Sequence, residues 1–167
     1  NFRKLREFNL SLNSDDASQL LLINANNGRG KTSLLKAFTW GLFGGLVTID
    51  DFSKSRLVDL KEGDFDNFSV EFQISIESTG ETAVLRRSRE VKVESGGKVA
   101  FEGDESLMVT VSKSDPSEPV EIVPDPRSWL EKHLPNRFQE FILFDGEKMS
   151  KFFDANVKRA IEKAIRE

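Results

Sequence analysis

The sequence predicts a mixed α/β fold in a single domain, and two stretches of different pattern indicate it. Near the start, an apolar run at residues 19–24 (QLLLIN) leads through a glycine-rich loop into KTSLLKAFTWGLF. Further on, residues 68–76 (FSVEFQISI) alternate apolar and polar side chains, which is typical of a half-buried strand. At 167 residues the chain is long enough for one substantial core.

The first stretch predicts a strand, a loop and a helix in succession. A short apolar run such as residues 19–24 is typical of a buried strand. After the loop, Gly44 and Gly45 supply a C-terminal stop for a helix. Apolar residues recur at helical spacing and predict the apolar face of that helix: Leu34, Leu35, Phe38 and Leu42.

The middle of the chain predicts an antiparallel meander, because turn residues separate several β-rich runs. Turns at 78–81 and 95–97 divide the strand at 68–76 from a second strand at 82–94 and a third run at 107–111. Four prolines between Pro116 and Pro126 then indicate a loop.

A short helix is expected after that loop. Asp125 has the side chain of an N-cap, and Pro126 fits the first helical position. The helix through residues 128–134 should stop before Pro135. His133, the only histidine, lies in it without a matching nucleophile, so we expect a surface or core role for its ring.

Composition excludes several classes of protein. The chain has no cysteine, which rules out disulfides and thiolate metal sites and fits a reducing cytoplasm. No apolar run approaches the ~20 residues that span a bilayer, so no membrane partner is expected. With 24 Lys+Arg against 28 Asp+Glu, the net charge of −4 argues against a general nucleic-acid coat, although a local basic stripe stays possible. We expect the Arg86, Arg87 and Arg89 cluster to be a solvated strand face, with a phosphate or DNA contact as the alternative.

The glycine loop matches a phosphate-binding pattern. Residues 25–32 (ANNGRGKT) follow the Walker A form GxxxxGK[ST], with Ala25 in place of the first glycine. In this pattern backbone N–H groups surround phosphate oxygens, Lys31 reaches the β- and γ-phosphates, and the Thr32 hydroxyl ligates Mg²⁺. We take Lys31 as the catalytic residue and expect ATP to bind at the following residues: Asn26, Asn27, Gly28, Arg29, Gly30, Lys31, Thr32 and Ser33.

Near the C-terminal end, residues 141–149 (FILFDGEKM) have the form of a Walker B strand. Four apolar residues precede Asp145, which would hold the metal, and Glu147 follows as the candidate base. Taken by itself, this pattern is also compatible with a small self-contained P-loop enzyme such as a kinase. The long antiparallel insertion and the lack of parallel βαβ repeats count against that alternative.

Several motifs together resemble the ABC-type ATPase heads of SMC-like and SbcC-like proteins. The chain opens with an NFR element, residues 1–3, and continues through NNGRGKTSLLKAF to Phe43-Gly44. The phrase LPNRFQEFILFDGEKM, residues 134–149, is very similar to one in the DndD-like ATPases of DNA phosphorothioation. The resemblance covers nearly the whole chain and is specific at the P-loop and at FDGEK.

The resemblance implies a split ATPase. FDGE falls at the family's Q-loop, so Asp145 would sense the metal, and Arg3 would approach the nucleotide phosphates. Residues 1–154 would form the N-terminal lobe, and residues 155–167 would begin a coiled coil. Since the chain starts without Met and stops within a helix-like run, we expect it to be a fragment. Without its C-terminal lobe, this fragment should turn over ATP hardly at all.

The same resemblance implies partners and a setting. The expected partners are the chain's own C-terminal ATPase lobe, a second head in a nucleotide-dependent homodimer, double-stranded DNA and other Dnd-type modification proteins. The expected setting is the bacterial cytoplasm near the nucleoid. An SbcC-like ATPase of repair or antiphage defence, and a nucleotide-gated module without turnover, remain as alternatives.

Overall fold

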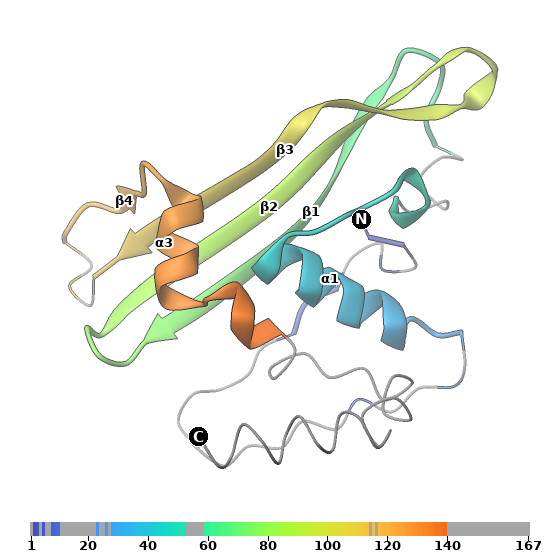
Figure 1. Ribbon diagram of the computed structural model, residues 1–167. Coiled ribbons are helices and arrows are strands. Elements are labelled where there is room, and N and C mark those ends of the chain that lie inside the picture. Colours follow the sequence, from blue (N-terminus) through green and yellow to red (C-terminus); the bar gives the residue numbers. More distant parts are fainter. Residues whose placement is uncertain are drawn as a thin grey trace.

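The computed structural model contains a four-stranded antiparallel sheet whose strands follow chain order, β1-β2-β3-β4 (Figure 1). The strands are β1 (Phe65–Ile76), β2 (Glu81–Val93), β3 (Val99–Ser112) and β4 (Glu121–Ile122). The structure describes residues 2, 3, 5, 8–10, 23, 26, 28–52, 59–113, 115 and 117–139. The predicted meander is confirmed.

Both predicted hairpin turns lie at glycines that leave the usual backbone region. β1 and β2 join where Ile76 pairs with Glu81, and Gly80 has φ 70° in the turn between them. β2 and β3 join where Val93 pairs with Val99, across a 3₁₀ turn at Ser95–Gly97. Positive φ values are readily available only to glycine, so these turns fix the register of the sheet.

Two strand predictions need correction. β3 starts at Val99, well before the run at 107–111, because pairing with β2 continues from Glu102 to Val99 beyond a register shift between Ser88 and Glu90. β4 lies in a segment expected to be a loop, and its two residues pair with Thr110 and Val111. Cross-strand hydrogen bonds outweigh local sequence preference at both places.

Two helices cover one face of the sheet (Figure 1). α1 spans Lys31–Phe43 and ends at Gly44, as predicted. α3 spans Pro126–His133, and Asp125 caps it by accepting a hydrogen bond from the Ser128 N–H at 3.1 Å. Among the residues that the structure describes, no helix has the length and apolar character needed to cross a bilayer.

The buried face of α1 differs from the predicted one. The buried residues are Ser33, Ala37, Trp40 and Gly41. The larger apolar residues that the pattern selected are half-buried and flank them, as Phe38 does against Phe72 at 5.1 Å between ring centroids. The small residues Ser33, Ala37 and Gly41 let the helix approach the sheet closely, and Trp40 packs against Phe68 of β1.

An aromatic cluster forms the first part of the core. Phe68 on β1 is fully buried, and the Trp40 ring lies 5.1 Å from it between centroids. Phe2 stacks on Trp40 at 5.7 Å and meets Phe68 edge-on at 6.0 Å. The N-terminal segment, α1 and the sheet are therefore joined through rings, which add about 0.5–1.5 kcal/mol per pair beyond buried area.

A second buried cluster lies under α3. Leu130 of α3 packs with Leu85 of β2 and Val109 of β3. Leu42 of α1 borders the same cluster, which places the two helices on one face of the sheet. Of the predicted buried strand at 19–24, only Ile23 is described, and this residue is 43% exposed and not part of a strand. The predicted strand at 141–145, the boundary at residues 154 and 155 and the tail helix lie outside the described residues.

Candidate nucleotide-binding site

The glycine loop ends where α1 begins. Gly30 is the N-cap with φ 107°, and the Leu34 N–H donates to its carbonyl at 2.9 Å, the first bond of the helix. Gly30 has no side chain to cap this end, and the first turn contains no acidic residue. The helix therefore points its N-terminal backbone N–H groups and the positive end of its dipole at the loop.

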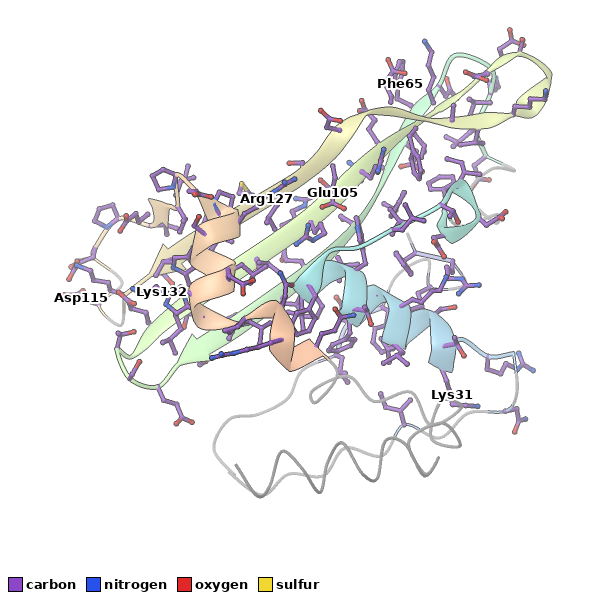
Figure 2. All side chains as sticks on the ribbon, viewed as in Figure 1. Lys31, Phe65, Glu105, Asp115, Arg127 and Lys132 are labelled. Atoms are coloured by element: carbon purple, nitrogen blue, oxygen red, sulfur yellow. The ribbon has the colours of Figure 1, made fainter. Side chains whose placement is uncertain are left out.

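The loop is folded around one carbonyl. The Asn26 carbonyl accepts from the Arg29 N–H at 3.2 Å and from the Lys31 ammonium at 3.3 Å. Gly28 has φ 77°, which turns the backbone between them. The Lys31 ammonium is thus held over the loop at the start of α1, where Figure 2 shows it.

Exposure separates the predicted binding residues into two groups. Lys31 and Thr32 are exposed, as are Asn26, Gly28 and Arg29. Ser33 is only 5% exposed and belongs to the buried face of α1. Its backbone N–H, rather than a projecting hydroxyl, is what this position offers at the helix end. Asn27 lies outside the described residues.

The N-terminal segment forms a tight turn beside the loop. Phe2 and Leu5 exchange backbone hydrogen bonds at 2.8 Å, and Arg3 between them has φ 50°. A Cβ on Gly30 would lie 3.5 Å from Leu5 Cδ2, so the turn touches the start of α1. Leu5 of this turn therefore lies against the start of α1, and the role of Arg3 at the nucleotide phosphates stays a prediction.

Asp51 holds that turn, a role the sequence did not indicate. Its carboxylate is 2% exposed and lies 3.5 Å from Arg3 Nε and 3.4 Å from Lys36 Nζ of α1. The same carboxylate accepts from the Thr48 N–H at 3.0 Å, and the Asp51 carbonyl accepts from the Arg3 N–H at 2.6 Å. Only the folded chain brings these segments together.

The arginine prediction on β2 is wrong for Arg87. This side chain is buried against α1, whereas Arg86 is exposed, and the Arg89 guanidinium lies 4.0 Å from the Phe101 ring centroid. The alternation of β2 contained the signal, because Arg87 is in phase with Leu85 and the buried face.

His133 has no catalytic arrangement. Its ring is exposed, stacks on Trp129 at 4.0 Å between centroids, and has Nδ1 2.8 Å from the Trp129 carbonyl. Those contacts are made within α3 and match the predicted surface role.

The described residues of the loop supply groups that suit the phosphates of a nucleotide, but only one side-chain ligand for Mg²⁺. Exposed N–H groups, the Lys31 ammonium and the Thr32 hydroxyl suit the phosphates of a nucleotide and one ligand position of Mg²⁺. Among the described residues, no group of three or more Asp, Glu, His or Cys side chains could hold a metal ion. Asp145, the predicted carboxylate ligand, lies outside them.

A Walker A loop that leads into an uncapped helix end is the phosphate-binding device of P-loop nucleoside triphosphatases. A protein-family model described as an AAA domain, AAA_23, matches residues 1–167. The chain belongs to this family, and it is a P-loop ATPase domain of the SMC/SbcC type. No curated protein matches the sequence at a significant level.

Proposed function

We propose that this chain is the ATP-binding half of an SMC-like ATPase that processes DNA. The observation that carries the proposal is the loop at residues 26–32 on an uncapped, exposed end of α1, in a chain of the SMC/SbcC-type family. The phrase at residues 134–149 favours a DndD-like role in phosphorothioate modification or restriction.

Each loop residue has a distinct role in this proposal. The backbone N–H groups from Gly30 to Ser33 bind phosphate oxygens, with Asn26, Asn27, Gly28 and Arg29 forming the rest of the loop. Lys31 leaves the Asn26 carbonyl to contact the β- and γ-phosphates. Thr32 offers its hydroxyl to the Mg²⁺ that accompanies ATP, an ion that neutralises phosphate charge. Arg3 adds a further cation near the phosphates.

Hydrolysis in this proposal requires a second lobe. Asp145 takes the Q-loop position and senses the metal, and Glu147 is not the base. A C-terminal lobe supplies the Walker B carboxylates and the group that orients water. Two such heads then close on ATP and open after hydrolysis, and a coiled coil passes that motion to double-stranded DNA.

The test measures ATP turnover by the chain alone and after addition of a C-terminal lobe from an SMC/SbcC-type ATPase, with and without duplex DNA. We expect binding but almost no turnover alone, and turnover with the second lobe, stimulated by DNA. Robust turnover by the chain alone would reject the split head, return Glu147 to the role of base and make Asp145 a Walker B ligand. Turnover without DNA stimulation would remove the DNA-processing role. ATP binding with no turnover even in the presence of the second lobe and DNA would favour a nucleotide-gated module.

A further inference from the structure

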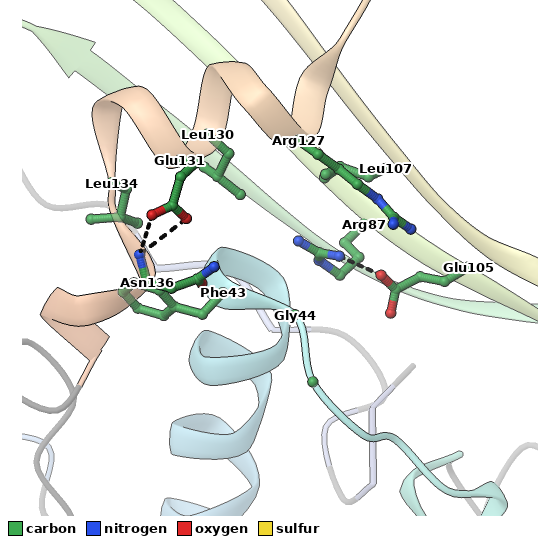
Figure 3. A pocket seen from close by; sticks show the side chains of 11 residues that line it. Phe43, Gly44, Arg87, Glu105, Leu107, Arg127, Leu130, Glu131, Leu134 and Asn136 are labelled. Carbon is green, nitrogen blue, oxygen red and sulfur yellow. Dashed lines mark hydrogen bonds and ion pairs between the residues drawn. The ribbon is translucent and has the colours of Figure 1, made fainter.

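A polar network joins the C-terminal end of α1 to the sheet. Glu105 on β3 accepts from the Trp40 indole Nε1 at 2.6 Å and from the Arg87 guanidinium. Arg87 on β2 also donates from Nε to the Gly41 carbonyl at 3.2 Å. Figure 3 shows the Arg87–Glu105 contact in a pocket of about 290 Å³ beside Gly44. Two strands and one helix therefore meet in a single network.

Arg87 caps the C-terminal end of α1 from outside the helix. The last turn of α1 contains no basic residue, and Gly41 is among the last four carbonyls, which find no partner within the helix. A guanidinium whose side chain is 6% exposed supplies both the hydrogen bond and the positive charge that a helix C-terminus favours. Because Arg87 lies on β2, this cap also holds the end of α1 against the sheet.

Apolar contacts bring α1 close to the sheet without defining its angle. At Gly41 the approach is so close that a Cβ would lie 2.3 Å from Phe72 Cε2. Hydrophobic attraction has no preferred direction, whereas hydrogen bonds weaken steeply when donor and acceptor are misaligned. The network around Glu105 therefore supplies the directional part of the contact.

The opposite end of the same helix begins at the phosphate loop. Lys31 and Gly41 lie about 15 Å apart along the axis at 1.5 Å per residue. A tilt of about 5° around the Gly41 end would move Lys31 by about 1 Å. Displacements of about 1 Å at a reacting group can reduce rates by up to ~100-fold.

We propose that Glu105 and Arg87 are positioning residues for the phosphate loop, holding α1 at the angle at which Lys31 and the helix N–H groups meet a nucleotide. The proposal rests on the proposed function, because it assumes that this loop binds ATP. It goes beyond it by assigning a role to residues on the sheet at the far end of α1.

A buried ion pair is a poor device for stability alone, which strengthens this assignment. Desolvation costs offset the attraction, and replacement of buried pairs by apolar residues of similar size is often neutral or stabilising. Glu105 is nearly covered, with a side chain 17% exposed. The Arg87–Glu105 pair provides a defined geometry, which a pair of apolar residues would not provide.

The experiment replaces the pair with the double variant Arg87→Met/Glu105→Met and measures thermal unfolding and the Kd for ATP with Mg²⁺. We expect ATP binding weakened by about tenfold or more, because the helix keeps its apolar contacts and loses its angle. We expect only a modest fall in Tm, which comes from the Trp40 N–H and the Gly41 carbonyl losing their partners. Trp40 emission in a Trp129→Phe background provides a second measurement. It should respond to ATP in the parent protein and not in the double variant.

Matched controls make each outcome decisive. Glu118→Gln breaks the exposed Lys113–Glu118 pair in the segment between β3 and β4 and should change neither Tm nor Kd. Unchanged ATP affinity in a folded double variant would overturn the positioning role. If that variant does not fold, Glu105→Gln, which keeps an acceptor for Trp40, takes the same test; loss of the fold in both would assign the network to stability and overturn the proposal. Failure of the parent chain to bind ATP would instead overturn the proposed function.

Discussion

The phosphate loop and the aromatic core under α1 are built in opposite ways, although one helix joins them. At the loop, Lys31 and Thr32 are exposed, and backbone bonds and glycines hold the chain. At the other end, Trp40 packs against Phe68, which has no exposed surface. The predicted binding residues therefore lie on an exposed segment with few packing contacts. The position of this segment depends on the packed core at the other end of α1.

The largest expected effect comes from the scaffold. Phe68→Ala should lower the free energy of unfolding by about 3–5 kcal/mol, because it empties the centre of the aromatic cluster. The matched control is Phe65→Ala on the same strand, where the ring is 52% exposed and its removal should have a small effect. Urea denaturation of both variants makes the comparison. Equal losses would contradict the assignment of the core to this face of the sheet.

The next effect concerns the loop and should leave the scaffold unchanged. Lys31→Ala removes the ammonium over the Asn26 carbonyl and should weaken ATP binding at least ~100-fold, about 2.7 kcal/mol, with Tm nearly constant. Calorimetric titration with ATP and Mg²⁺ measures it. Lys98→Ala, at an exposed site beside the β2–β3 turn, is the control. Unchanged affinity in Lys31→Ala would remove the loop as the binding site.

For the phosphate loop and for the scaffold, the sequence predicted those features that depend on residues close together in the chain. The Walker A spacing is local, and the family match supports a P-loop there. The stop at Gly44, the two glycine turns and the Asp125 cap also depend on residues a few positions apart, and the structure confirms them. The coarse fold follows from them, since a helix after a glycine loop and a meander of strands can pack in few ways.

The failures share one physical cause, which is a partner distant in sequence. The charge of Arg87 suggested solvent, but Glu105 and the Gly41 carbonyl satisfy it inside the fold. The buried face of α1 follows its fit against Phe72 and Phe68 rather than the sizes of its own side chains. Asp51 belongs to the same class, since Arg3 and Lys36 reach it only after folding.

The smallest effect tests a local signal at the edge of the scaffold, the cap of α3. The Ser128 hydrogen bond lowers the pKa of Asp125 below its ordinary value of 3.8, because it favours the ionised carboxylate. A lowered folded-state pKa means that the stabilisation is complete above the unfolded value and is lost as pH falls through the folded one. The difference in Tm between the parent and Asp125→Ala should therefore be constant near neutral pH and shrink below about pH 4. α3 covers Leu85 and Val109, and Figure 2 shows its residues Arg127 and Lys132 away from Lys31, so ATP affinity at neutral pH should not change. A loss of ATP affinity in Asp125→Ala would show that α3 also supports the phosphate loop. It would contradict the assignment of α3 to the scaffold alone.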